Sequence, residues 1–181
     1  MALFAHPIPE DWRSRYAQFL DLDQTRAALR HDDSEAFFVA YPRVVNDGTP
    51  VALLKKPLAQ ARIGVITTGG IHLPQQTPFR SDHMLGDCSA RLFSADLSHV
   101  AWSISHGHYD ETAARQDLNV VLPLDPLRAL VDDGVIGSLA ARAGSIDGYC
   151  TDAGGLLDDA GQTLLESMRQ DGADALLMVP V

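Results

Sequence analysis

The chain has 181 residues, of which 46% are hydrophobic, and this is enough to bury one substantial core. Its formal net charge of -10 argues against DNA and RNA as partners, because nucleic-acid binding depends on Lys and Arg neutralising phosphates. No apolar run reaches the roughly 18 residues of a membrane span, and the opening residues lack the order of a signal peptide, so we expect a cytoplasmic protein without membrane contact.

Residues 1–57 are predicted to form an N-terminal helical and extended region that packs on the rest of the chain. Pro9 and Glu10 suit the start of a helix. An apolar face follows at helical spacing and consists of Trp12, Tyr16, Phe19 and Leu20. The cluster Asn46–Gly48 predicts a turn, after which a weak strand leads to a boundary at Lys55–Pro57.

Residues 58–181 are predicted to form the core domain. The β-branched run Arg62–Thr68 indicates a central parallel strand that enters a glycine loop. Short strands are expected at Ala90–Ala95 and His99–Ser105. Leu124–Val131 predicts a helix that ends at Gly134.

The end of the chain contains the clearest helix, Leu156–Gln170, followed by an apolar strand at Ala173–Val181. This order of elements predicts an α/β fold with a mostly parallel, doubly wound sheet in three layers, of the Rossmann-like or flavodoxin-like kind. Such sheets bind ligands beyond the carboxyl ends of their strands, where this chain stops. We therefore expect a sheet that is incomplete on its C-terminal side and a homo-oligomer that forms through the exposed last strand.

The first candidate site is Ser105–Asp110, in which His106, His108 and Asp110 lie close together in sequence. The pattern superficially resembles the zinc signature HxHxDH of metallo-β-lactamase-like hydrolases, although Glu111 stands where the last histidine should be. The alternative is a hydrogen-bonded loop in which Asp110 fixes the tautomer of a histidine. Roles in structure and in substrate binding are both open here, and we predict no metal site.

The second candidate site is the loop after the first core strand. Backbone N–H groups of Thr68, Gly69 and Gly70 could cradle an anion, and His72 follows at a position that could face a substrate. The loop matches neither common nucleotide-binding motif, so a simple strand-ending turn is the competing interpretation.

The third candidate site is the polar loop Gly86–Arg91. Asp87 and Arg91 can form an ion pair there or bind a charged substrate. Cys88 and Cys150, the two cysteines of the chain, are too far apart in sequence for a CxxC motif, and each is expected to behave as a small buried residue. Cys88 and Arg91 are accordingly weak candidates.

Several linked segments resemble selenoprotein B of the glycine/sarcosine/betaine/D-proline reductase family. The resemblance covers about residues 55–181. It is carried by Lys56–His72, Ser105–Asp110, Asp117–Asp125, Leu127–Arg128, Gly134–Gly137, Gly148–Tyr149 and Asp171–Val181. In that family the last of these segments leads into a selenocysteine-x-x-Cys or Cys-x-x-Cys motif. The resemblance therefore implies that the redox residue would come immediately after Val181, with no catalytic residue and no cofactor in the present chain.

The resemblance also implies a reaction and partners. A selenolate would attack a small, amino-acid-like substrate or a thioether-like intermediate, and the neighbouring thiol would resolve the product. A pyruvoyl-containing partner subunit and a thiol or thioredoxin-type electron donor are expected. His72, His106, His108 and Asp110 would then position substrate or transfer protons near the selenol, and the chain alone would be inactive. The alternatives are a non-catalytic α/β domain that binds a small molecule or a partner, and a metal-dependent hydrolase.

Overall fold

The structure is a computed structural model that describes residues 11–44, 52–97 and 101–181. Its centre is a four-stranded sheet in the order β3-β5-β1-β6. The strands are β1 (Arg62–Thr67), β3 (Ala90–Ser94), β5 (Ser138–Ile146) and β6 (Ala175–Val179). β1 runs parallel to β5 and β6, whereas β3 is antiparallel to β5. This sheet confirms the predicted α/β class and the mostly parallel pairing.

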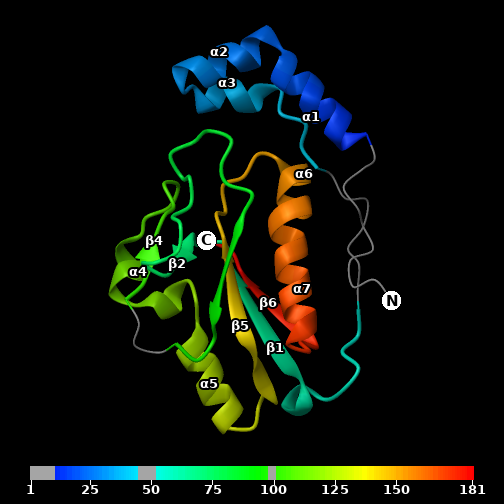
Figure 1. The fold of residues 1–181 in the computed structure, drawn as a ribbon, viewed down its shortest axis with the longest axis vertical. Helices are drawn as coiled ribbons and strands as arrows, with labels where there is room; N and C mark the ends of the chain where they lie inside the picture. Colours follow the sequence, from blue (N-terminus) through cyan, green and yellow to red (C-terminus); the bar gives the residue numbers. More distant parts are fainter. Residues whose placement is uncertain (1–10, 45–51, 98–100) are drawn as a thin grey trace.

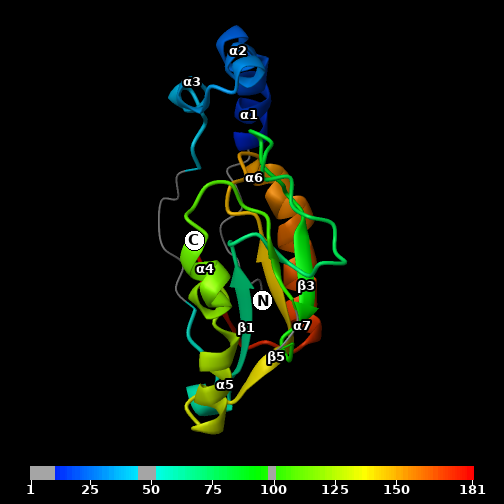
Figure 2. The same cartoon turned by 90° about the vertical axis from the view of Figure 1, so that its left-hand side faces the viewer.

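Helices cover both faces of the sheet, so the domain has three layers (Figure 2). One face carries α4 (Thr112–Gln116), η2 (Leu118–Val120) and α5 (Leu124–Asp132). The other carries α6 (Ala153–Leu156), the π-helical turn η3 (Leu157–Gly161) and α7 (Gln162–Gln170), which follow one another without a break. The parallel strands point toward α6 and the N-terminal helices, and the C-terminus lies at that same end (Figure 1).

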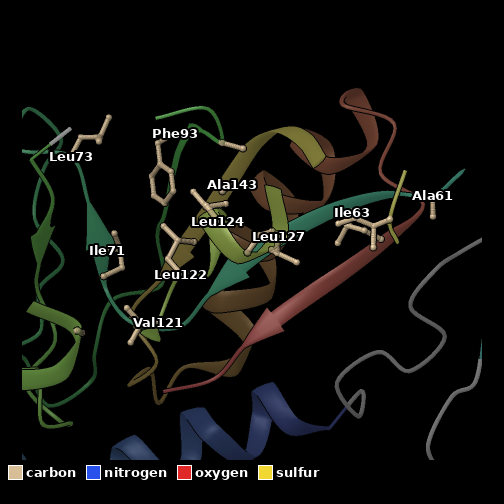
Figure 3. Close-up of a cluster of buried hydrophobic side chains, with 14 residues drawn as sticks. Ala61, Ile63, Ile71, Leu73, Phe93, Val121, Leu122, Leu124, Leu127 and Ala143 are labelled. Atoms are coloured by element: carbon tan, nitrogen blue, oxygen red, sulfur yellow. The ribbon is translucent and has the colours of Figure 1, made fainter. Parts of the chain in front are cut away.

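The larger hydrophobic cluster fills the space between the sheet and α5 (Figure 3). Ile63 and Val65 both project into it from β1, because alternate residues of a strand point to the same side. Leu124 and Leu127 meet them from α5, and Phe93 joins from β3. Each such side chain stabilises the fold by about 1.5–3 kcal/mol relative to an exposed one, so this cluster is a main source of stability.

On the opposite face, strand glycines set how closely α7 approaches the sheet. A Cβ atom at Gly64 would lie 2.6 Å from Met168 Sδ, and one at Gly144 would lie 2.3 Å from Leu164 Cδ2. Glycine weakens a strand by itself, and in a strand it often marks a place where another element comes close. Here both glycines leave room for α7 side chains.

The strand β5 lies between β3 and β1, yet its sequence did not predict a strand. Ser138–Ile146 is rich in Ala, Gly and Ser, which have little β propensity, and it contains a charged residue, Arg142. Asp171 accepts hydrogen bonds from the Arg142 backbone N–H at 2.8 Å and from its guanidinium at 2.6 Å. This pairing accommodates the charge within β5.

A second, two-stranded sheet pairs β2 (Ile71–His72) with β4 (Ser103–Ile104) in antiparallel fashion. Of the strand predicted at His99–Ser105, only Ser103 and Ile104 form a strand, β4, and residues 99 and 100 lie outside the described residues. The predicted strand at Ala90–Ala95 is β3.

The helices predicted in the core are confirmed, with one difference in length. The helix predicted from Leu156 begins earlier, because the Asp152 carboxylate caps its first turn by accepting the Gly155 N–H at 2.8 Å. α5 ends just before Gly134, where a φ of 71° requires glycine-like freedom. No helix in the described part of the chain combines the length and apolar character of a membrane span.

The N-terminal region contains α1 (Trp12–Asp21), α2 (Asp23–His31) and α3 (Ser34–Val39), and η1 (Leu58–Gln60) leads into β1. Trp12, Tyr16 and Phe19 are buried in an aromatic cluster with Phe37. The Tyr16 hydroxyl is 3.0 Å from the Thr151 hydroxyl, which connects α1 to the segment after β5. The predicted helix start at Pro9 and Glu10 and the turn at Asn46–Gly48 lie outside the described residues.

Candidate functional site

The candidate site lies at the carboxyl ends of the parallel strands. β1 is followed by Thr68, β5 by Asp147 and β6 by Pro180 and Val181. The Thr68 hydroxyl accepts the backbone N–H of Val181 at 2.9 Å, so the last residue of the chain lies beside the loop after β1. This is the edge at which open α/β sheets bind their ligands.

A buried histidine and a buried aspartate face each other at this edge. His106, in the loop after β4, is 6% exposed and Asp147 is 1% exposed. His106 Nδ1 accepts the backbone N–H of His108 at 3.1 Å, so the neutral ring carries its proton on Nε2. That Nε2 atom is 3.5 Å from Asp147 Oδ1, which is longer than a hydrogen bond.

Burial governs the electrostatics of this pair. It lowers the pKa of His106 and raises the pKa of Asp147, because both charged forms lose their hydration, and each shift is opposed by attraction between the two charges. Asp147 Oδ1 accepts the Tyr149 N–H at 3.1 Å. His106 Nε2 and Asp147 Oδ2, in contrast, have no hydrogen-bond partner within the described residues. An unsatisfied buried polar group costs about 1–3 kcal/mol, so this arrangement requires an explanation.

Gly148 packs closely against the unsatisfied His106 nitrogen. A Cβ atom at position 148 would lie 3.1 Å from His106 Nε2 and 3.1 Å from Thr68 Oγ1. Both distances are shorter than ordinary van der Waals contacts, so the position favours glycine. The imidazole N–H and the Thr68 hydroxyl therefore both lie close to the Gly148 backbone.

The other two members of the predicted His106–Asp110 cluster have different partners. The His108 ring is exposed and stacks on Tyr149, with ring centroids 3.9 Å apart. Asp110 accepts the Thr112 N–H at 2.9 Å at the start of α4, and hydrogen bonds from the Thr112 side chain and backbone keep the pKa of Asp110 low. The expectation that Asp110 fixes the tautomer of a histidine is therefore wrong: the carboxylate next to His106 belongs to Asp147.

These contacts do not form a metal site. Within residues 11–44, 52–97 and 101–181, no group of three or more His, Cys, Asp or Glu side chains is arranged to hold a metal ion. The geometry therefore gives no support to the hydrolase alternative.

His72 is placed in β2 with both ring nitrogens engaged. Nδ1 lies 2.9 Å from the Leu73 carbonyl and Nε2 lies 2.9 Å from the Ser105 hydroxyl. Because a carbonyl oxygen can only accept, Nδ1 donates and Nε2 accepts the Ser105 proton. With 4% exposure, His72 is a satisfied core histidine that holds the loop before His106 in place.

The glycine loop does not offer the free N–H groups that were expected of an anion cradle. The Thr68 N–H donates to Val179 O at 3.0 Å, the Gly69 N–H to Thr67 Oγ1 at 3.0 Å and the Gly70 N–H to Ile146 O at 3.0 Å. The Thr68 and Gly70 donors thus connect β1 to its neighbours β6 and β5, whereas the Gly69 donor is used within the loop itself. The loop is a strand-ending turn, and its contribution to the site is the Thr68 hydroxyl.

In the third loop, Arg91 has a structural environment. Its Nε donates to Thr77 O at 2.7 Å, and its guanidinium lies 4.2 Å from the centre of the Phe79 ring and 4.0 Å from the Asp87 carboxylate. The predicted Asp87–Arg91 ion pair is therefore present. Cys88 lies directly beside Cys150, a contact that the sequence spacing did not indicate.

Comparison with known proteins identifies a family. The model of "Glycine/sarcosine/betaine reductase selenoprotein B" matches residues 28–180 of the chain. The chain is 29% identical over 130 residues, 72% of its length, to the D-proline reductase subunit gamma of Acetoanaerobium sticklandii, and this covers 51% of that protein. It is 26% identical over 186 residues to the glycine reductase complex component B subunit gamma of Peptoclostridium acidaminophilum, covering 95% of the chain and 41% of the relative.

A further relative is the betaine reductase complex component B subunit beta of Peptoclostridium acidaminophilum, which is 29% identical over 156 residues, 83% of the chain and 35% of that protein. The chain thus spans about half or less of the length of these relatives. No solved structure matches the chain.

Proposed function

Because the chain belongs to the glycine/sarcosine/betaine reductase selenoprotein B family, we propose that it is the N-terminal part of a reductase subunit that cleaves a small, amino-acid-like substrate reductively. The relatives are named as subunits of D-proline, glycine and betaine reductases, which supports a role within a multi-subunit reductase. The cytoplasm is the proposed location.

The observation that carries this proposal is the unsatisfied His106–Asp147 pair at the carboxyl edge of the sheet. His106 Nε2–H is buried beside Gly148 and has no partner among the described residues, so it can donate a hydrogen bond to a bound group. We propose that Asp147, whose pKa is raised by burial, gives a proton to the leaving amine when its carboxyl group is protonated. The neutral His106 would keep its Nε2 proton and donate it as a hydrogen bond to the substrate.

We further propose that selenocysteine follows Val181 and supplies a low-pKa nucleophile when present. The Val181 N–H bond to Thr68 would bring that residue to the site's edge, close to His106. A pyruvoyl-containing subunit would hold the substrate amine, and a thiol or thioredoxin-type donor would return the electrons. His108 and Asp110, both exposed, would border the entrance to the site.

The test begins with the nucleotides beyond the codon for Val181, where a TGA followed in frame by an x-x-Cys motif is expected. The whole gene is then expressed with selenocysteine recoding and partner subunits, and glycine, sarcosine, betaine and D-proline are offered with dithiothreitol as reductant. We expect one of them to be consumed with equimolar oxidation of the dithiol. An ordinary stop codon, or binding of one of these compounds without consumption, would instead favour a non-catalytic binding domain.

We also propose that the chain forms a homo-oligomer through β6. This strand is at the edge of the sheet, and its side chains Leu177 and Met178 are 37% and 52% exposed. Leu176 and Met178 border an apolar groove against α7. An edge strand with exposed apolar residues favours pairing with a second copy.

Met178→Lys is expected to reduce this association, because the charge would have to be buried against the partner's apolar surface. Sedimentation velocity of the present chain over a range of concentrations should show dimers that the variant lacks. Val39→Lys, which changes an equally apolar but 80% exposed residue on α3, is the matched control and should leave the dimer intact. A chain that stays monomeric at high concentration would contradict the proposal.

A further inference from the structure

The two cysteines of the chain meet at the amino end of β3 and the carboxyl end of β5. Cys88 and Cys150 are 62 residues apart in sequence, yet their Sγ atoms are 2.9 Å apart, while both thiols remain unbonded and half-buried. A disulfide needs an Sγ–Sγ distance of about 2.05 Å, so only a small displacement separates the pair from a covalent bond.

The backbone around the pair holds both thiols in this place. A β-bridge joins Gly86 to Cys150, and Cys88 O accepts the Ala160 N–H at 3.0 Å from η3. Each Sγ atom lies 3.6 Å from the carbonyl oxygen of Asp152, the residue that caps α6. The thiols are therefore fixed by the loop before β3, the segment after β5 and the helix above them.

We propose that Cys88 and Cys150 form a thiol–disulfide exchange site that reacts with small-molecule disulfides and closes reversibly to an intramolecular disulfide. This inference uses the geometry of the two thiols alone and does not rest on the proposed reductase function. The segment after β5 would then carry two functional residues, since Cys150 lies three residues beyond Asp147.

The exchange runs in two steps that balance. The Cys88 thiolate attacks one sulfur of the small disulfide, which releases one thiolate and leaves a mixed disulfide on Cys88. The Cys150 sulfur then attacks the Cys88 sulfur and releases the second thiolate. The two protein thiols lose two electrons to the small disulfide, and their two protons end on the two released thiols.

The surroundings predict how the reaction depends on pH. Burial raises the pKa of both thiols, that of Cys150 most strongly, and the carboxylates of Asp87, Asp152 and Asp159 add to the effect at Cys88. Tyr16 of α1 and Tyr41, which follows α3, are close enough to Cys150 to interact with its charge. Cys88 thus ionises first, and its attack should become about tenfold faster per pH unit over the range in which it is mostly protonated.

The test uses the native chain incubated with oxidised glutathione, followed by acid quenching and intact mass measurement. We expect both free thiols to disappear with the loss of two hydrogen atoms and without a lasting glutathione adduct. Because the bond would close a loop of 62 residues, oxidation should also raise the Tm by several degrees. Dithiothreitol should reverse both changes.

Cys150→Ser is the matched control, because it keeps the attacking thiol and removes the resolving one. This variant should accumulate one glutathione per chain on Cys88, and far-UV circular dichroism should show that it is folded. The proposal would be overturned if wild-type protein kept both thiols free at every glutathione ratio, or accumulated glutathione adducts, or formed only disulfides between chains.

Discussion

Replacing Asp147 by asparagine is expected to stabilise the isolated chain near pH 7, although it should lower the kcat of the proposed reductase by on the order of a hundredfold. Asp147 is 1% exposed, and burial raises its pKa. At neutral pH the folded state is therefore destabilised, because it must either bury a charged carboxylate or keep the carboxylate protonated. Asparagine keeps the oxygen that accepts the Tyr149 N–H and carries no charge. A gain in stability together with a loss of activity is typical of a functional residue.

The sign of the pH dependence follows from the two shifts. Asp147 has a raised pKa, so its contribution to stability is greatest below the unfolded value of 3.8 and is lost as pH rises through the folded value. The advantage of the Asp147→Asn variant should therefore grow from about pH 4 toward neutrality. His106 has a lowered pKa, so its contribution to the free energy of unfolding is present above pH 6.5, the unfolded value, and is lost as pH falls through the lower folded value. The His106→Asn variant should not show this loss of stability at low pH.

Urea unfolding at a series of pH values measures both effects, and Asp171→Asn is the control with the opposite sign. The hydrogen bonds from Arg142 keep the pKa of Asp171 low, so its stabilising contribution is present above 3.8 and lost as pH falls through the lower folded value. Asp171→Asn should thus destabilise the chain at pH 7. A loss of stability in Asp147→Asn at pH 7 would show that the carboxylate is a structural ion-pair partner and contradict its assignment to the site.

Local sequence patterns predicted the elements that are apolar and β-branched or strongly amphipathic. β1 and α7 were predicted from such patterns, and the residues that the patterns place on the apolar faces are the buried ones. β5 could not be found in this way, because its strand conformation depends on neighbours on both sides and on Asp171, 29 residues from Arg142. Tertiary contacts of this kind override weak β propensity.

The structure places His106 at the carboxyl edge of the sheet, where the sequence led us to expect a site, because this placement depends on strand order and a local motif. The role of His106 in a site stays a prediction. Asp147 and the Cys88–Cys150 contact were missed, because each depends on where β5 lies in the sheet. The sequence signal that was available is the Asp147–Gly148 pair, a polar residue and a glycine directly after a strand, as also found after β1.

The largest loss of stability is expected from Gly86→Ala, on the order of 4 kcal/mol. Gly86 has a φ of 77°, and a Cβ atom there would lie 1.9 Å from the carbonyl oxygen of Tyr149. That contact is with backbone, so it can be relieved only if the loop before β3 separates from the segment after β5. The Gly86–Cys150 bridge would then open and the two thiols would move apart.

Gly134→Ala is the matched control, because Gly134 has a φ of 71° but a Cβ atom there would have no neighbour within 4 Å. Its free energy of unfolding should fall by only about 1 kcal/mol, which is the cost of placing alanine at a positive φ. Urea unfolding measures the loss of stability in both variants. The Gly86→Ala loss should exceed the Gly134→Ala loss by about 3 kcal/mol, because only Gly86→Ala adds a clash with the Tyr149 carbonyl. Oxidised glutathione should also leave an adduct on Gly86→Ala but not on Gly134→Ala. Equal stability of the two variants would mean that the loop before β3 moves freely, and that the contact between Cys88 and Cys150 is not fixed by the fold.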